Sequence, residues 1–281
     1  MIKKAFSLIE LSIVMIIIGL IISGIIGGQN LIALSRLSSA QTLTNSSPVN
    51  STEDLVLWIE TTSKSSFDKS DRVDNAVVSD WYDINPQSTS KHHLRQTTSG
   101  REPLYIKNGI NNLPSIRFAG TNDSLVDTGK ESDLDIATPT MFLVSSGSGT
   151  YTAKNQSPNS NSARKLQTTQ NAFISGANGS DVSFTYPSGA TKTDVHIRVL
   201  VSKSNTDHIM YIDGTQKITS SIMYHDQFND AAFRIGSAFT DTAENLTGDI
   251  GEVIIFNRAL STFEVEQIMN YLSKKWKIDL D

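Results

Sequence analysis

The stretch GDIGEVIIFNRALSTFEVEQIMNYLSKKW, residues 248–276, places a short apolar run directly before an amphipathic segment. The run at 252–256 is typical of a buried β-strand. Ser261 is followed three residues later by Glu264, which is the capping-box pattern of a helix start. The apolar residues that follow recur near the helical period, at Phe263, Val265, Ile268, Met269 and Leu272. This stretch therefore predicts a strand followed by a helix that packs on a sheet.

Upstream of this stretch the chain repeats short apolar runs between turn-forming residues. The runs lie at 55–59, 115–118, 140–144, 196–201, 208–212 and 232–235, separated by Gly, Asn, Asp and Ser. Many short strands of this kind predict a mainly β fold, with an antiparallel β-sandwich over residues 53–281. Trp58 and Trp81 are expected in its core, because tryptophan is usually buried. The polar segment 145–183 is expected to hold loops and edge strands.

Several segments of this region resemble a known family. They are Asp80-Trp-Tyr-Asp83, Arg101-Glu-Pro103, Asn112–Gly120, Tyr211-Ile-Asp-Gly214, Phe233-Arg-Ile-Gly236 and Gly248–Ser261. They are similar to the laminin-G-like, concanavalin A-like jelly rolls of bacterial surface proteins. The resemblance implies two stacked antiparallel sheets with a ligand surface on the concave face or in the loops. The family includes sugar binders, protein binders and some glycosidases, so it indicates architecture better than function.

The N-terminal segment is of a different kind. Lys3 and Lys4 precede a stretch without charge, Leu11–Gly28, whose 18 residues reach the threshold for a membrane-spanning helix. Glu10 lies at its edge, although a charge near the centre of such a helix costs about 2.5–3.5 kcal/mol. A secretory signal peptide is disfavoured, because the run is long and lacks a small-x-small cleavage site. A plain signal anchor explains everything except Glu10. Cleavage just before Phe6 explains Glu10 as well, because the new amino group of one copy could neutralise Glu10 of the next.

The sequence Lys-Lys-Ala-Phe-Ser-Leu-Ile-Glu-Leu, residues 3–11, resembles the class III leader of type IV pilins and pseudopilins. The resemblance implies that a prepilin peptidase cuts between Ala5 and Phe6 and that Phe6 becomes an N-methylphenylalanine. It implies also that Glu10 guides the addition of the subunit to a filament. The family usually has glycine before the cut, where this chain has Ala5. Because a small residue is retained, processing is expected, at lower efficiency.

The layout expected from these features has four parts. A leader peptide at 1–5 precedes a transmembrane and filament-core helix at 6–41, a linker at 42–52 and the sandwich at 53–281. Gly19, Ser23 and Gly27 are spaced by four, so they share a helical face on which neighbouring helices could approach closely. The general abundance of glycine in membrane helices explains them equally well. The linker is polar, rich in Ser, Thr and Asn, and contains Pro48, which is typical of a hinge.

Composition excludes several kinds of chemistry. The chain has no cysteine, so it has no disulfide, thiolate zinc site, iron–sulfur cluster or cysteine nucleophile. Its formal net charge of −5 argues against a general nucleic-acid partner. The acids Glu131, Asp133 and Asp135 are the nearest to a glycosidase pair, but a solvated loop is favoured and no enzyme activity is expected. None of the five histidines has the spacing of a zinc site.

Calcium is the one metal for which the sequence offers candidates. Calcium sites are built from oxygen-rich loops. Five aspartates lie within a short segment, Asp68 among them, and the weak candidates for ligands are Asp71, Asp74, Asp80 and Asp83. No EF-hand pattern is present. No other cofactor is expected.

These features predict a type IV pilin-like filament subunit, minor or at the tip, that displays a lectin-like domain for adhesion or ligand binding. The expected partners are a prepilin peptidase, other pilin subunits, the inner membrane, and a glycan or surface-protein ligand. The protein is expected in the inner membrane before assembly and afterwards in a periplasmic or extracellular filament. Two alternatives stay open: a pseudopilin of a secretion or DNA-uptake machine, and a membrane-anchored carbohydrate-active enzyme.

Overall fold

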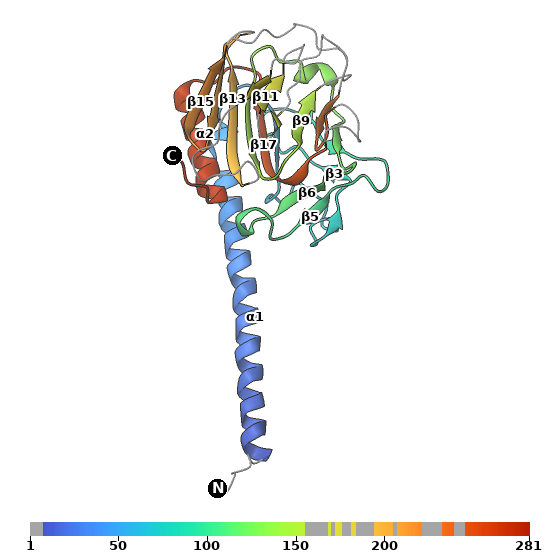
Figure 1. Ribbon diagram of the computed structural model, residues 1–281, viewed down its shortest axis with the longest axis vertical. Helices are drawn as coiled ribbons and strands as arrows, with labels where there is room; N and C mark the ends of the chain where they lie inside the picture. Colours follow the sequence, from blue (N-terminus) through green and yellow to red (C-terminus); the bar gives the residue numbers. More distant parts are fainter. Residues whose placement is uncertain are drawn as a thin grey trace.

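The computed structural model consists of a long N-terminal helix, a β-sandwich and a helix that covers one sheet (Figure 1). The structure describes residues 8–154, 168–169, 172–175, 181–183, 194–204, 207–220, 232–238 and 245–281. Within these residues all strand pairs are antiparallel. The predicted mainly β fold is therefore confirmed.

The first sheet contains nine of the described strands. Its order is β15 (Thr215–Ser220), β14 (His208–Ile212), β13 (His196–Ser202), β8 (Thr140–Ser145), β17 (Thr247–Phe256), β6 (Ser115–Ala119), β5 (Leu104–Ile106) and β2 (Ala76–Val77), with β1 (Leu55–Glu60) paired to β17. The strand that the sequence placed at 252–256 is the second half of β17. β17 pairs with β8 along one edge; along its other edge, its first half pairs with β6 and its second half with β1.

The second sheet contains eight of the described strands. Its order is β12 (Asp181–Ser183), β11 (Ala172–Ser175), β10 (Thr168–Thr169), β9 (Thr150–Lys154), β16 (Phe233–Ile235), β7 (Leu125–Asp127), β4 (Leu94–Arg95) and β3 (Asp80–Trp81). Three short 3₁₀ helices are described as well: η1 (Pro48–Asn50), η2 (Ile110–Asn112) and η3 (Glu131–Leu134).

Two hydrophobic clusters stabilise this arrangement, and β8 contributes to both. Met141 and Leu143 belong to the cluster between the two sheets, whereas Phe142 and Val144 belong to the cluster under the helices. Because successive strand residues point to opposite faces, a strand buried on both faces must be apolar throughout. This explains the continuous apolar run at 140–144. Each fully buried side chain of this size contributes about 1.5–3 kcal/mol to the stability of the fold.

The helix α2 (Thr262–Trp276) confirms the expected C-terminal helix. Ser261 and Glu264 form a complete capping box, in which each side chain bonds to the other's backbone. Trp58 and Trp81 are buried, as expected. Phe263, which the periodicity placed on the packed face, is instead 67% exposed. Lys275 differs in the opposite sense, because it is buried although it lies beside Lys274 in the last turn of the helix.

The helix α1 (Leu8–Asn45) is longer at its C-terminal end than the sequence suggested. Residues 42–45, expected in a solvated linker, belong to the helix, so this part of the expectation is wrong. The physical reason is that polar side chains donate hydrogen bonds to the backbone carbonyls of the last turns of the helix. Thr42 and Ser46 donate to carbonyls four residues back, and the Asn50 amide donates to the carbonyls of Thr44 and Asn45. Val49 of η1 is fully buried, so the chain does not form a free hinge here either.

Candidate functional site

The most unusual surface in the described part of the chain is the N-terminal part of α1, which projects from the sandwich as a stalk (Figure 1). At 38 residues the helix is about 57 Å long. Large apolar side chains cover its described part and are 44–84% exposed. They are Leu8, Ile9, Leu11, Ile13, Val14, Met15, Ile16, Ile17, Ile18, Leu20, Ile21, Ile22, Leu31, Ile32 and Leu34. An exposed apolar surface of this extent is typical of an interface with protein or lipid.

The residues singled out for filament assembly lie on or before this stalk. Glu10 is exposed in the first turn of α1, where the positive end of the helix dipole stabilises a carboxylate. Ala5 and Phe6 lie outside the described residues, and so do the side chains of residues 23 and 27. Gly19 faces open space, because a Cβ added there would meet nothing within 4 Å. Within the described residues, no helical stretch is both long and apolar enough to cross a membrane.

The opposite end of α1 is joined to the sandwich by specific contacts. Ala40 and Thr44 are buried against α2 and the first sheet. The Gln41 amide donates to the carbonyl of Thr62 at 2.8 Å. The Thr44 hydroxyl lies 3.4 Å from the Tyr271 hydroxyl of α2. The stalk is therefore attached to the folded domain over more than one helical turn.

A buried cluster of charges lies directly under this attachment. Glu60 and Glu252 are opposite each other in the register of β1 and β17. The Lys275 ammonium from α2 lies 2.9 Å from Glu60 Oε2 and 2.9 Å from Glu252 Oε2. All three side chains are at most 1% exposed. Two carboxylates thus share one ammonium in the interior, and Glu60 Oε1 has no hydrogen-bond partner. We call Glu60, Glu252 and Lys275 the junction cluster.

Aromatic donors complete the junction cluster around Glu252. Its Oε1 accepts hydrogen bonds from Trp58 Nε1 and the Tyr271 hydroxyl, each at 2.8 Å. Its Oε2 accepts from Trp276 Nε1, also at 2.8 Å. Burial, followed by the charge of Glu252, raises the pKa of Tyr271 well above its ordinary value, so the phenol remains a donor. These bonds tie β1, β17 and α2 together beneath α1.

The aspartates proposed for calcium do not share a site. Asp83 is buried and accepts from the backbone N–H groups of Trp58, Asn85 and His92, and its burial raises its pKa. Asp80 pairs with Arg95 at 2.5 Å. The remaining two bind locally: Asp71 accepts from the Ser70 hydroxyl, and Asp74 accepts from the Lys107 amide. Across the described part of the chain, no group of three or more potential metal ligands converges.

The acids considered for hydrolysis also have separate partners. Asp135 forms an ion pair with the buried Lys154. Asp133 Oδ2 lies 3.9 Å from His92 Nε2, while His92 Nδ1 lies 2.8 Å from Asp127 Oδ2. The side chain of Glu131 lies outside the described residues.

The contact between His92 and Asp127 could not be inferred from the sequence, because 35 positions separate the two residues. Burial lowers the pKa of His92, but the hydrogen bond and charge of Asp127, together with the charges of Asp83 and Asp133, outweigh burial, so the net shift is upward.

The fold defines an antiparallel jelly-roll-like sandwich, and comparison with known proteins agrees. Residues 133–266 match the family described as the concanavalin A-like lectin/glucanases superfamily. This is the resemblance that the sequence suggested for the sandwich, and it is supported. No match is found among curated proteins.

Solved structures are similar at low sequence identity. A Trypanosoma rangeli sialidase in complex with sialic acid is 14% identical with a TM-score of 0.52, over 91% of this chain and 40% of the sialidase. The receptor binding domain of botulinum neurotoxin mosaic serotype C/D is 14% identical with a TM-score of 0.52, over 79% of this chain and 51% of that domain. The binding domain of Paraclostridial Mosquitocidal Protein 1 is 14% identical with a TM-score of 0.52, over 79% of this chain and 52% of that domain. This chain thus spans about half or less of each, and the likeness shows the fold.

Proposed function

We propose that this protein is a pilin-like filament subunit that displays a carbohydrate-binding sandwich. The observation that carries the proposal is the exposed apolar surface of α1 on a helix fastened to a folded domain. Each large apolar side chain gains about 1.5–3 kcal/mol when it is fully buried. Fifteen such side chains between Leu8 and Leu34 therefore favour burial in lipid or among the helices of other copies.

The position of Glu10 supports assembly through helices. It is the one acidic residue of α1, and apolar side chains surround it on the same helix. A carboxylate in such surroundings is costly unless a positive group compensates it. A new amino terminus at Phe6 of an adjacent copy is a group of the required charge. This chain would be cut after Ala5 by a prepilin peptidase, held in the inner membrane, and then transferred to a periplasmic or extracellular filament.

The proposed carbohydrate ligand is supported by the fold and by the family match. The matched family is named for lectins and glucanases, and one similar structure is a sialidase in complex with sialic acid. We propose binding without hydrolysis, because Asp135 pairs with Lys154 whereas Asp133 faces His92, so the two carboxylates have different neighbours.

The assembly test is the Glu10→Val variant in cells that build filaments from the native chain. The variant is expected to enter the membrane and fold its sandwich, but to be lost from sheared filaments. Glu10→Asp, which keeps the charge, is the matched control and is expected to retain part of the incorporation. Equal incorporation of the valine variant and the native chain would contradict the proposal. Mass spectrometry of the mature N-terminus is expected to find methylated Phe6, whereas an intact Met1 would favour a plain anchor.

The ligand test is binding of the detergent-solubilised full chain to a glycan array that includes sialylated sugars. Binding of at least one sugar class, competed by the free sugar, is the expected result. The absence of binding across the array would contradict the carbohydrate part of the proposal and leave the assembly part standing.

A further inference from the structure

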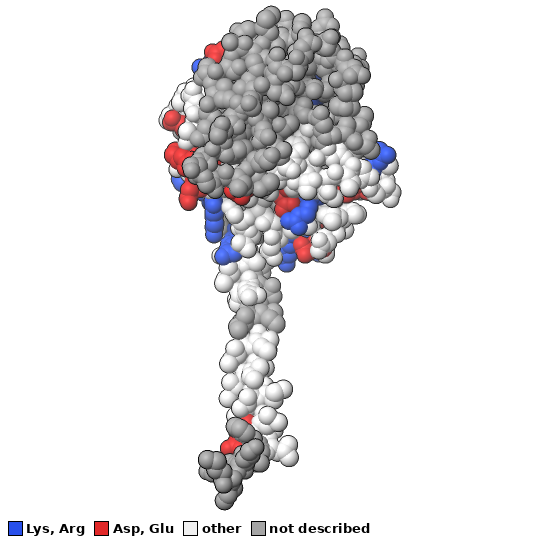
Figure 2. Space-filling view, in the orientation of Figure 1, with Lys and Arg blue, Asp and Glu red and all other residues white. Residues whose placement is uncertain are grey.

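A discontinuous ring of basic side chains lies on two sides of α1 where the helix meets the sandwich. Figure 2 shows Lys and Arg side chains on both sides of this point, with a few acidic ones among them. The local charge contrasts with the rest of the domain, because residues 42–281 hold 21 Lys and Arg against 28 Asp and Glu. A basic ring on an otherwise acidic domain needs an explanation.

One side of the ring is a hollow beside Leu34, Leu37 and Gln41 of α1. Its volume is about 780 Å³. The basic residues that line it are Lys64, Lys69, Arg72 and Lys107. The three lysines are exposed, and Nε of the half-buried Arg72 has no hydrogen-bond partner. An unpaired guanidinium nitrogen beside three ammonium groups favours an anion in this hollow.

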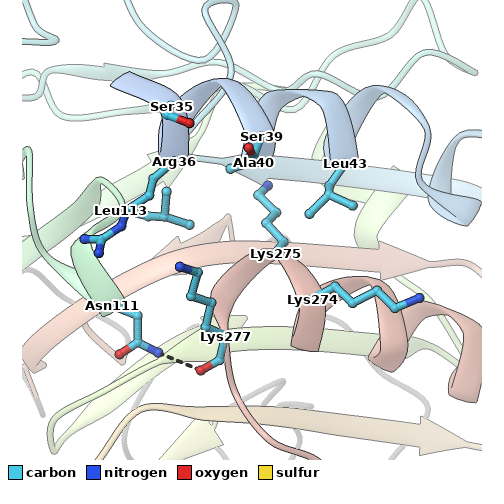
Figure 3. A pocket seen from close by; sticks show the side chains of 10 residues that line it. All are labelled: Ser35, Arg36, Ser39, Ala40, Leu43, Asn111, Leu113, Lys274, Lys275 and Lys277. Carbon is cyan, nitrogen blue, oxygen red and sulfur yellow. Dashed lines mark hydrogen bonds between the residues drawn. The ribbon is translucent and has the colours of Figure 1, made fainter. Parts of the chain in front are cut away.

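The other side of the ring is a smaller hollow, of about 150 Å³, between α1 and the end of α2. Arg36, Lys274 and Lys277 line it together with Asn111, whose amide donates to the backbone carbonyl of Lys277 at 3.3 Å. Figure 3 shows that Arg36 comes from α1 and Lys277 from the segment after α2, and that both border the same space. The α1 residues of this hollow lie on a different helical face from those of the larger one.

The described residues that line these two hollows include no Asp or Glu. The acids bonded to lining residues do not neutralise the accessible cations: Glu60 and Glu252 bind the buried Lys275, and Asp74 accepts from the backbone amide of Lys107 rather than from its ammonium group. Eight basic residues line the two hollows; Lys275 is buried in the junction cluster, and we call the other seven, which are accessible, the basic collar. Its charges lie on opposite faces of α1, so it presents positive charge around the helix rather than on one flank.

The basic collar follows directly after the apolar stalk. Leu31 and Leu34 are more than 60% exposed and lie within two turns of Arg36. From Leu11 to Leu34 the helix rises about 36 Å, slightly more than the hydrocarbon core of a bilayer, at about 30 Å. A stalk inserted to that depth would place the basic collar at the level of the lipid headgroups. Basic residues at this level are attracted to anionic lipids.

We propose that the basic collar contacts the phosphate groups of anionic phospholipids while α1 is inserted in a bilayer. The inference rests on the proposed membrane-inserted state of the subunit. Contact on both sides of α1 would hold the acidic sandwich close to an anionic surface and set the depth of the stalk. It would be released when the subunit leaves the membrane for the filament.

The experiment uses the full chain in vesicles. Because the chain lacks cysteine, Asn108→Cys gives a single dye position beside the larger hollow. Energy transfer from this dye to a rhodamine-labelled headgroup is measured in vesicles of phosphatidylcholine and in an equimolar mixture with phosphatidylglycerol. Transfer is expected to be higher in the mixture and to fall as salt is raised, because exposed charges are screened.

Two double variants test the two sides, K64Q/K107Q and K274Q/K277Q. Each removes two lysines and is expected to lower the apparent equilibrium constant for headgroup contact by about thirtyfold. The matched control K130Q/K203Q removes the same charge from exposed lysines that line neither hollow, and it is expected to behave as the native chain. Equal transfer in both vesicle types, or an equal loss in the control, would overturn the inference.

Further arms distinguish other occupants. If millimolar inorganic phosphate in solution abolishes the transfer in mixed vesicles at constant ionic strength, the basic collar is a site for free phosphate, and the lipid inference fails. If transfer rises with protein density rather than with phosphatidylglycerol, the occupant is a second copy of the chain, and the inference fails again.

Flotation with phosphatidylcholine vesicles tests the proposed function separately. Loss of flotation refutes membrane insertion, whereas flotation without a lipid preference refutes only the role of the basic collar.

Discussion

Substitution of Lys275 by methionine is expected to destabilise the sandwich strongly. The ammonium group makes three hydrogen bonds, to Glu60 Oε2 and Glu252 Oε2 at 2.9 Å and to the Tyr271 hydroxyl at 3.1 Å. Methionine keeps the length of the aliphatic stem, so the change removes the charge with little loss of volume. Two carboxylates would then remain buried opposite each other without a counter-ion. Breaking a buried ion pair in this way costs about 3–5 kcal/mol.

The assay is thermal unfolding of the full chain in a mild detergent, followed by near-ultraviolet circular dichroism. Trp58, Trp81 and Trp276 are each at most 1% exposed, so their signal reports on the folded interior. For a domain of this size, a loss of 3–5 kcal/mol lowers the melting temperature by about 10 °C. The far-ultraviolet signal of α1 is expected to persist above that transition.

A second variant separates loss of charge balance from loss of packing. Lys275→Met combined with Glu60→Gln and Glu252→Gln removes all three charges and keeps the side-chain sizes. Removing all the charges of a buried ion cluster together avoids the cost of an unpaired charge in the interior. The triple variant is therefore expected to recover at least half of the lost melting temperature. A loss below about 1 kcal/mol for Lys275→Met, or a triple variant less stable than the single one, would refute the electrostatic reasoning.

Three further predictions concern other parts of the domain. The Arg258 guanidinium, bonded to Glu264 at 2.5 Å, lowers the pKa of Glu264 from 4.5 to about 2. The stability that the ionised Glu264 contributes is therefore complete above pH 4.5 and is lost as the pH falls towards 2. Arg258→Gln should make the free energy of unfolding depend less steeply on pH in that window. The pKa of His92 is raised above 6.5 in the folded protein. The stability that the protonated His92 contributes is therefore complete below pH 6.5 and is lost as the pH rises through the pKa of the folded state. Urea midpoints measured across that range should decline in the native chain and stay level in Asp127→Asn. A Cβ at Gly251 would lie 2.5 Å from the Trp276 ring, so Gly251→Ala should cost about 1–3 kcal/mol in urea unfolding, whereas Gly28→Ala, with nothing within 4 Å, should cost nothing.

The parts of the fold that could be predicted from the sequence depend on local patterns. The capping box at Ser261 and Glu264 involves residues three apart, so the start of α2 was visible at once. The apolar run at 140–144 likewise indicated a strand buried on both faces. The matched family then agreed with the sandwich. In each case the information lies within one element, where a period or a cap identifies the structure.

The parts that could not be predicted depend on contacts between distant segments. Lys275 had the sequence context of a solvated helix end, but Glu60 is 215 positions away and lies under the same helix. His92 and Asp127 meet because β4 pairs with β7. Residues 42–45 had the composition of a hinge, since Ser, Thr and Asn favour loops as well as helix ends. The bonds of the Asn50 amide at the helix end and the contact of Thr44 with Tyr271 decide between these alternatives.

The continuity of α1 into the domain changes how the molecule would act in a filament. A flexible linker would let the sandwich rotate freely about the stalk, and its direction would be set by neighbouring subunits. Here the bonds from Gln41 and Thr44 hold the end of the helix against the domain, directly above the junction cluster. An ionic cluster of this kind has strict geometric requirements, because each charge must meet its partner or remain unpaired in the interior. Any sliding of α2 along β1 and β17 would separate Lys275 from both carboxylates. The junction cluster therefore links the packing of the sandwich to the direction of the stalk, and a subunit built in this way would present its sandwich at one fixed angle to the axis along which its helix assembles.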